Sequence, residues 1–447
     1  MVRANPKEQH VTPGTRIGCG AGFASDRLQP AVDLVERGAL DTLVLECLGE
    51  RTVSLASLRA SEGSGPGYDP MLRRRLELLL EPLHRRGTRL VTNAGAADPV
   101  AAGAMAAELA ASLGLPTTVA AVSGDDVLDR IDPSAPCWED GEPLESHGEL
   151  VSANAYLGAE ALLPALRGGA DVVVAGRAAD PSLFLAPLVH DLGWDPSDEG
   201  LLAAGTLVGH LLECAGQLTG GYFADPGRKD VAGLADLGFP LAEVDGDGRA
   251  VVTKLPGTGG RVDRMTVTEQ LTYEVTDPRA YLTPDVSLDM TGVRLRELGG
   301  DRVLVDGARG FARPRTLKVS VGYRAGYRGE GEISYTGPGA VARARLAGEV
   351  VRERLGDRVR SRVDLIGAGS GHDDAAFSEC RLRVAALSTD RAGAQAVEEE
   401  VTALYTCGPA GGGGVRTRSG EVVGILSSTI AREHVEPAVS WFGEERR

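Results

Sequence analysis

Cysteine and aromatic residues are both scarce in this sequence. The six cysteines in 447 residues are scattered, and no two of them form a C-x-x-C pair. A disulfide framework or a zinc site of the usual spacing is therefore not expected, and the sequence predicts a cytoplasmic protein. Aromatic residues make up only 4% of the chain, which is too few to suggest platforms that stack with nucleic-acid bases.

Long hydrophobic runs and an excess of positive charge are also lacking. No run approaches the eighteen apolar residues of a membrane span, and the first thirteen residues lack the apolar stretch of a secretory signal. The net charge of −16 makes nucleic acid an unexpected partner, because nothing would displace counterions from phosphate. An anionic small substrate stays compatible, since local basic residues can line a cleft.

The remaining composition is that of an ordinary globular protein of two or three domains. Short β-branched runs alternate with amphipathic segments in the first half, which predicts βαβ units around a mostly parallel sheet. The predicted strands cover residues 15–19, 42–46, 88–92, 117–122, 149–152 and 171–175.

After about residue 235 the pattern changes. Alternating runs at 250–254, 302–305 and 316–321 predict mainly antiparallel strands, and a helix is predicted over 338–354. We therefore expect an α/β protein in which residues 1–235 form a mostly parallel βαβ domain. Residues 236–447 are expected to form an α+β domain.

Polar side chains follow the predicted parallel strands. In an open parallel sheet the ligand crevice lies beyond the carboxyl ends of the strands. Each residue on its own is equally typical of a turn or a helix cap, but together they predict one cleft. These residues are Glu46, Asn93, Asp125, Asn154 and Arg177.

A glycine-rich segment follows the first predicted strand. Gly18, Gly20 and Gly22 form a G-x-G-x-G pattern before a predicted helix, where bare amides could bind an anion or a phosphate. A tight strand-to-helix turn is the alternative. Cys19 lies in the same segment, near a helix N-terminus that would lower the pKa of a thiol, so a nucleophile there is a further alternative.

Two pairs of residues could carry acid–base chemistry. Arg177 and Asp180 follow a hydrophobic strand, where they could bind a substrate carboxylate or simply pair with each other. His210 and Glu213 lie three residues apart on a predicted helix, which suits an acid/base pair, a metal pair or a structural network.

Two loops complete the candidate residues. Thr219 and Tyr222 lie in a helix-ending loop next to the His210–Glu213 pair, and we include them as substrate-binding candidates. His372 and the two aspartates that follow it could bind a divalent metal or form a solvated turn. No complete cofactor or metal motif is present, so the sequence assigns no cofactor and leaves a divalent metal undecided.

Several segments together resemble the acyclic terpene utilisation protein A family. The resemblance covers most of the chain and is most specific between residues 203 and 221. The segments that carry it are Gly22–Asp26, Val91–Gly95, Ser123–Asp126, Ser152–Ala159, Gly176–Phe223, Pro256–Gly260 and Val267–Leu271.

The resemblance implies a role in carboxylic acid or acyl-CoA metabolism. The family's namesake belongs to bacterial catabolism of citronellol and geraniol through branched CoA thioesters. This chain has Ala178 where relatives often have threonine. Relatives also often carry, or are encoded beside, a ferredoxin-like module of about a hundred residues, for which we expect no room here.

Two hypotheses follow for the function. The first is a hydratase, lyase or isomerase acting on a carboxylate or CoA thioester. Arg177 would bind the substrate carboxylate, Glu46 or Asp180 would be the general base, and His210 with Glu213 would be an acid/base pair. The second is a non-catalytic subunit that binds such a ligand and works with a partner. A homo-oligomer or a small separate ferredoxin-like partner is expected to complete the assembly.

Overall fold

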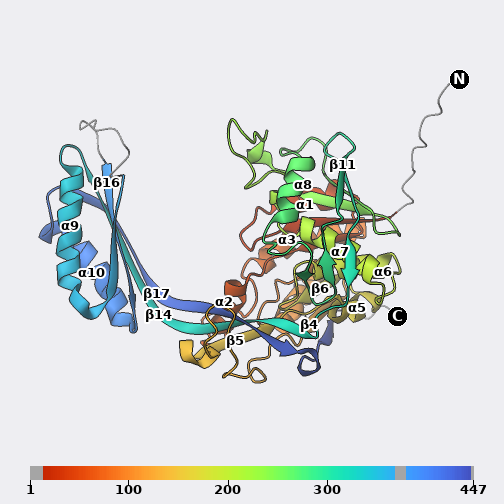
Figure 1. Cartoon of the computed structure of the whole chain (residues 1–447), viewed down its shortest axis with the longest axis horizontal. Coiled ribbons are helices and arrows are strands. Elements are labelled where there is room, and N and C mark those ends of the chain that lie inside the picture. Colours follow the sequence, from red (N-terminus) through yellow and green to blue (C-terminus); the bar gives the residue numbers. More distant parts are fainter. Residues whose placement is uncertain (1–13, 368–378, 444–447) are drawn as a thin grey trace. The chain divides into compact units, whose positions relative to one another are not determined.

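The computed structural model describes residues 14–367 and 379–443, so the predicted metal-binding turn at His372 lies outside the described residues (Figure 1). The chain forms two compact units. The first comprises the segments up to Glu142, Val151–Val321 and the segment from Leu426, and the second comprises Pro143–Leu150 and Gly322–Ile425.

A ten-stranded mixed sheet forms the centre of the first unit. Its five central strands are parallel, and the strands on either side pair with them antiparallel. The strand order is β11 (Arg294–Glu297), β12 (Val303–Asp306), β8 (Ala250–Lys254), β7 (Pro240–Val244), β1 (Thr15–Ala21), β2 (Thr42–Leu45), β3 (Arg89–Thr92), β6 (Val172–Ala175), β4 (Val119–Ser123) and β18 (Ala438–Phe442). This confirms the predicted mixed α/β class.

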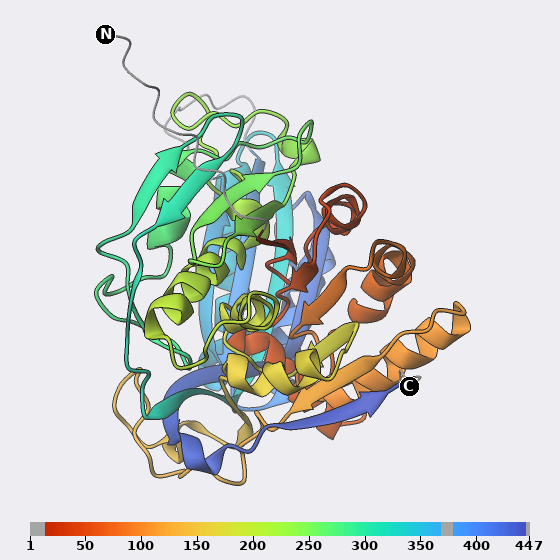
Figure 2. The ribbon, with the colours of Figure 1, turned by 90° about the vertical axis from the view of Figure 1, so that its right-hand side faces the viewer.

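Helices connect the parallel strands. Strands β2 and β6 are buried at every position, as expected where helices cover both faces of a parallel sheet. In Figure 2 the last strand, β18, in dark blue, runs beside the orange segment that holds α4 and β4. The helices are α1 (Gln29–Arg37), α2 (Glu50–Ser61), α3 (Leu72–Arg86), α4 (Pro99–Ser112), α5 (Ala159–Arg167), α6 (Ser182–Asp191), α7 (Glu199–Leu212) and α8 (Arg264–Thr272). None of the helices in the described part of the chain has the length and apolarity that a membrane span needs.

One predicted strand lies outside the ten-stranded sheet. β5 (Leu150–Ala155) was expected as the fifth strand of the parallel sheet, but it pairs with β14 (Thr316–Thr336). Its sequence explains the difference, because Ser152 and Asn154 make it more polar than the continuous apolar runs of β2 and β6. A small sheet of β13 (Arg309–Phe311), β10 (Ser287–Asp289) and β9 (Tyr281–Leu282) completes the first unit.

The expected domain boundary near residue 235 falls inside the first unit. β7 begins at Pro240 and pairs with β1 along four residues, so the central sheet continues past that position. That residues 1–235 and 236–447 fold as separate domains stays a prediction.

The second unit has the order βαββαβ. It consists of the later part of β14, α9 (Ala340–Leu355), β15 (Arg360–Ile366), β16 (Glu379–Ser388), α10 (Arg391–Cys407) and most of β17 (Gly412–Ala431). Its strand order, β15-β16-β14-β17, is that of the split βαβ or ferredoxin-like arrangement. The expectation that the chain has no room for a module of this kind is therefore wrong.

The core of the second unit lies between its helices and its sheet. Ile333, Leu382 and Val401 are fully buried there. Helix α10 was not predicted from the sequence, although Ala394, Val397, Val401 and Leu404 follow a helical spacing and are all buried.

The first strand of the central sheet contains two of the glycines proposed to bind an anion. Gly18 pairs with Leu43 of β2 and Leu241 of β7, so it lies in the sheet and not in a loop. A Cβ atom at Gly20 would lie 2.8 Å from both Ala31 Cβ and Leu45 Cδ2. Close packing of β1 against α1 and β2 thus explains the lack of a side chain at Gly20.

We expect Gly20→Ala to destabilise the protein by about 1–3 kcal/mol, the usual range for overpacking a core. Urea unfolding measures this change. Gly246→Ala is the matched control, because a Cβ atom at Gly246 would meet nothing within 4 Å. Equal stability of the two variants would contradict the packing explanation.

Candidate functional site

The side chains that follow four of the parallel strands lie at one edge of the sheet, where Asn154 of β5 joins them. Asn93 donates a hydrogen bond to Glu46 Oε1 at 2.9 Å, which joins the ends of β3 and β2. Asn154 Nδ2 and the backbone N–H of Arg177 both donate to Asp125 Oδ2, each at 2.9 Å. The structure thus brings together the five residues that the strand ends pointed to.

Arg177 is the buried centre of this group, with 1% of its surface exposed. Its guanidinium donates to the carbonyl oxygens of Ala178 and Leu48 and to the carboxylate of Asp180. It also stacks on the ring of Tyr156, with Cζ 4.3 Å from the ring centroid. These contacts differ from the expected role, because Arg177 holds Asp180 and the Leu48 loop and does not line the pocket described below.

The positive charge of Arg177 acts on two carboxyl groups, those of Glu46 and Asp180. Burial and the nearby Asp180 carboxylate raise the pKa of Glu46 to about 8, although Arg177 opposes the shift. Burial also raises the pKa of Asp180, whose side chain is about one-third exposed. Glu46 therefore carries a proton at neutral pH. Its neighbour Asp180, in contrast, is partly exposed to solvent.

Asp125 is a third buried carboxyl at the same edge. Burial raises its pKa to about 6, against the hydrogen bonds from Arg177 and Asn154. A Cβ atom at Gly176 would lie 2.3 Å from Asp125 Oδ1, so the chain needs glycine at this position. Asp125 thus fixes the backbone just before Arg177.

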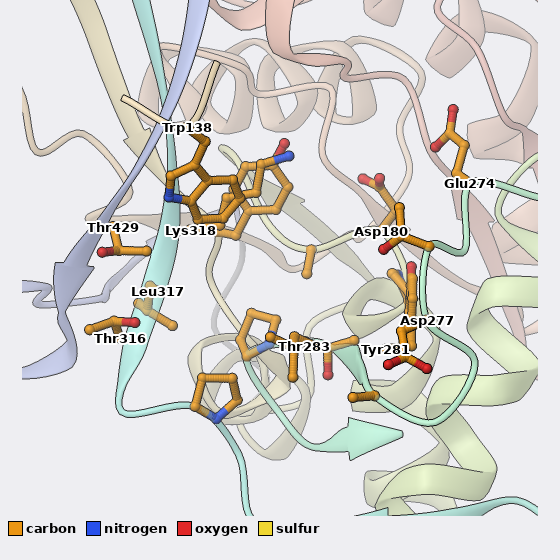
Figure 3. Close-up of a pocket in the computed structure, with 18 of the residues that line it drawn as sticks. Trp138, Asp180, Glu274, Asp277, Tyr281, Thr283, Thr316, Leu317, Lys318 and Thr429 are labelled. Atoms are coloured by element: carbon orange, nitrogen blue, oxygen red, sulfur yellow. The ribbon is translucent and has the colours of Figure 1, made fainter. Parts of the chain in front are cut away.

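A pocket of about 420 Å³ opens beside these groups, within the first unit (Figure 3). Five carboxylates line it, those of Glu50, Asp180, Glu213, Glu274 and Asp277, and Lys318 is the basic side chain among the described lining residues. The other residues that line it are Trp138, Tyr156, Ala179, Pro181, Thr276, Ala280, Tyr281, Leu282, Thr283, Pro284, Pro314, Thr316, Leu317 and Thr429.

His210 and Glu213 form a buried hydrogen-bonded pair at the wall of this pocket. His210 Nδ1 lies 3.3 Å from Glu213 Oε1, and His210 Nε2 lies 3.2 Å from the carbonyl oxygen of Leu271. Because a carbonyl oxygen only accepts, Nε2 carries a hydrogen. Nδ1 and Glu213 then share one further proton.

Glu213 is the member of the pair that lines the pocket. Burial raises its pKa to about 7, although its hydrogen bond to His210 opposes the shift. Burial acts to lower the pKa of His210, but the contacts with Glu213 and Leu271 raise it. With a pKa of about 7 this carboxyl can take up or release a proton near neutral pH, and its buried Oε2 has no hydrogen-bond partner among the described groups.

A second cluster in the pocket was missed by the sequence analysis. Tyr156 donates a hydrogen bond to Glu50 at 2.6 Å, and Lys318 Nζ donates to the same oxygen at 3.1 Å. Burial opposes ionisation of Glu50, but Tyr156, Lys318 and Arg177 lower its pKa to about 2. Burial likewise acts to lower the pKa of Lys318, but Tyr156 and Glu50 raise it.

Signals for this cluster were present in the sequence. Lys318 is one of only four lysines and lies between Leu317 and Val319 in the predicted strand at 316–321. Glu50 follows the second strand by five residues, and Tyr156 lies in a segment that carries the family resemblance.

Several candidate residues lie away from the pocket. The Thr219 hydroxyl donates to the carbonyls of Gly216 and Gly238, which makes it part of the loop's internal bonding. Tyr222 is 88% exposed and does not line the pocket. The Gly22 amide donates to Asp26, and burial raises the pKa of the Cys19 thiol well above its usual value. These contacts favour a structural role for the glycine segment over an anion site or a nucleophile.

The carboxylates of the pocket are spread along its wall. Among the described residues, they do not bring three ligand atoms within 4.8 Å of one another. A divalent metal stays undecided, and each of these carboxyl groups is considered below as a separate proton-carrying group.

Comparison with known proteins supports the resemblance seen in the sequence. The sequence pattern of one family, described as "Acyclic terpene utilisation family protein AtuA", matches residues 15–441. The chain belongs to this family. Membership of the AtuA family indicates a role in acyclic terpene utilisation. No curated protein and no solved structure gives a match to the chain.

We expect Arg177→Ala to destabilise the protein by about 3–5 kcal/mol, because it leaves buried carboxyl groups without their cation. Chemical unfolding measures the change. Arg313→Ala is the control, since Arg313 is half-exposed in its pair with Glu160 and should contribute about 0–1 kcal/mol. A stable Arg177→Ala variant that no longer binds ligand would restore the substrate-binding role expected from the sequence.

Glu46 should make stability depend on pH. Folded Glu46 keeps its proton up to about pH 8, whereas the unfolded group loses it near 4.5. The stabilisation is complete below the lower value and is lost as pH rises through the upper one. Glu46→Gln should therefore gain thermal stability relative to wild type across this range. A constant difference in melting temperature between the two proteins would rule this out, and exposed Glu108→Gln is the control.

Proposed function

We propose that this protein is an enzyme that performs acid–base chemistry on an acyl-CoA or carboxylate substrate, as a hydratase, lyase or isomerase. The observation that carries this proposal is Glu213. It is a largely buried carboxyl with a pKa of about 7 that lines the pocket and is hydrogen-bonded to His210. A group poised in this way is what proton transfer at neutral pH requires.

The charge of the pocket favours a thioester over a free carboxylate. Five carboxylates line the pocket against one lysine, and the nearby Arg177 donates to three protein groups and does not line the pocket. A carboxylate substrate would meet repulsion from Asp180 and Glu274, whereas the carbonyl of a thioester carries no net charge.

The residues divide into a base, an acid and a cation. The Asp180 carboxylate takes a proton from the carbon next to the thioester carbonyl, and the electron pair of that C–H bond moves to the carbonyl oxygen. The Lys318 ammonium stabilises the negative charge that develops there. Glu213, which shares a proton with His210, gives a proton to another carbon in an isomerase or to a departing hydroxyl group in a hydro-lyase.

Positioning residues support these groups from behind. Arg177 fixes Asp180, and Glu46 holds a proton beside it, which keeps a second negative charge from forming there. Glu50 fixes Lys318 through the hydrogen bond at 3.1 Å.

The alternative is a non-catalytic subunit that binds the same ligand and acts with a partner. The same pocket would serve it, without proton transfer. A homo-oligomer remains part of either proposal, whereas the ferredoxin-like arrangement of the second unit removes the reason for proposing a separate partner of that kind.

Solvent exchange tests the proposal. The protein is incubated in D₂O with citronellyl-CoA and geranyl-CoA, and mass spectrometry measures deuterium uptake and addition or loss of water. We expect uptake with the wild type and a loss of about 100- to 10,000-fold in rate for Asp180→Asn and Glu213→Gln. Glu108→Gln, on the exposed face of α4, should exchange at the wild-type rate. Binding of the thioesters without exchange would favour the non-catalytic subunit.

A further inference from the structure

The pocket has two ends of different chemistry. Asp180, Glu274 and Tyr281 lie together at one side in Figure 3, across from Trp138 and Leu317. The carboxyls of Asp180 and Glu274 both raise the pKa of Glu213, so the proton-carrying groups are close neighbours at the acidic end.

The opposite side, which we call the apolar end, holds Trp138 and Leu317, with Thr316, Lys318 and Thr429 beside them (Figure 3). Pro314, Pro284 and Leu282 also line the pocket and add aliphatic surface. Trp138 is 60% exposed and Leu282 is 65% exposed, so much of this apolar surface faces solvent. Large apolar side chains that stay exposed in a concave site are typical of ligand contacts.

The position of Trp138 is fixed by its backbone. Its N–H donates to the carbonyl of Ser427 at 2.9 Å, and the N–H of Ser427 donates to Glu139 at 3.0 Å. The turn that follows is closed by a hydrogen bond from Gly141 to Cys137. The loop thus holds an exposed indole at the pocket in a defined place, at the cost of leaving it in water.

We propose that the apolar end binds the hydrocarbon chain of the substrate and that Trp138 determines which chain length is accepted. This inference rests on the proposed function, because the acidic end then receives the reacting carbonyl. Leu317 and the prolines contact the chain along the wall of the pocket, and the exposed indole packs against it.

Binding of CoA thioesters of increasing chain length tests this inference. Calorimetry gives the Kd of acetyl-CoA, butyryl-CoA and geranyl-CoA for the wild type and for Trp138→Ala. In the wild type each buried methylene should tighten binding about fourfold. Trp138→Ala should weaken geranyl-CoA by about tenfold or more and leave acetyl-CoA unchanged. Trp138→Phe should restore most of the loss.

Trp441→Ala is the matched control, because this tryptophan is 46% exposed on β18 and does not line the pocket. It should bind all three thioesters like the wild type. Tryptophan fluorescence adds a second readout: geranyl-CoA should change the emission of the wild type and of Trp441→Phe, but not that of Trp138→Phe.

Three results would overturn the inference: no dependence of Kd on chain length in the wild type, equal weakening of all three thioesters by Trp138→Ala, or no weakening at all. These results are separate from the exchange experiment. Chain-length-dependent binding that requires Trp138, without deuterium uptake, would leave this inference standing and refute the enzymatic proposal.

Discussion

The site depends on the burial of one guanidinium, that of Arg177. It lies at the end of β6, the strand between β3 and β4 in the sheet, and it contacts groups from several segments. A buried cation needs partners, so Asp180, the Leu48 carbonyl and the Tyr156 ring are drawn to it. The arrangement of Asp180 in the pocket is therefore a consequence of how the charge of Arg177 is compensated inside the protein.

Burial and repulsion between neighbouring carboxylates together explain why some carboxyl groups of the site keep a proton. Glu46 and Glu213 have pKa values raised in this way to about 8 and about 7, so at neutral pH each holds a proton for much of the time. Glu50 behaves in the opposite way, since Tyr156 and Lys318 keep it ionised. The pocket thus contains both proton donors and fixed negative charge within a short distance.

The rule that ligands bind beyond the carboxyl ends of parallel strands predicted where the candidate site lies. The residue types alone did not predict the contacts that each side chain makes there. Apolar runs located the five parallel strands of the sheet to within a few residues, and Glu46, Asn93, Asp125 and Arg177 follow their ends. Asn154 joins them from β5, which was wrongly predicted as a further parallel strand. Whether Arg177 faced a ligand or the protein could not be read from its position, because that depends on carbonyls such as that of Leu48, far away in sequence. The sequence also could not predict that Lys318 and Trp138 line the same pocket, because the two residues are far apart in sequence and come together only in the fold.

The contacts of Lys318 with Glu50 and Tyr156 have one further consequence for an enzyme that acts on thioesters. A thioester held beside a neutral amine can transfer its acyl group to the amine nitrogen. A lysine in an active-site pocket is therefore exposed to acylation by the substrate. An amine attacks only when it has lost its proton. Because Glu50 and the Tyr156 ring keep Lys318 as an ammonium ion, its nitrogen lone pair is not available. The same contacts that let this side chain stabilise negative charge would thus protect the protein from covalent self-inactivation by its own substrate.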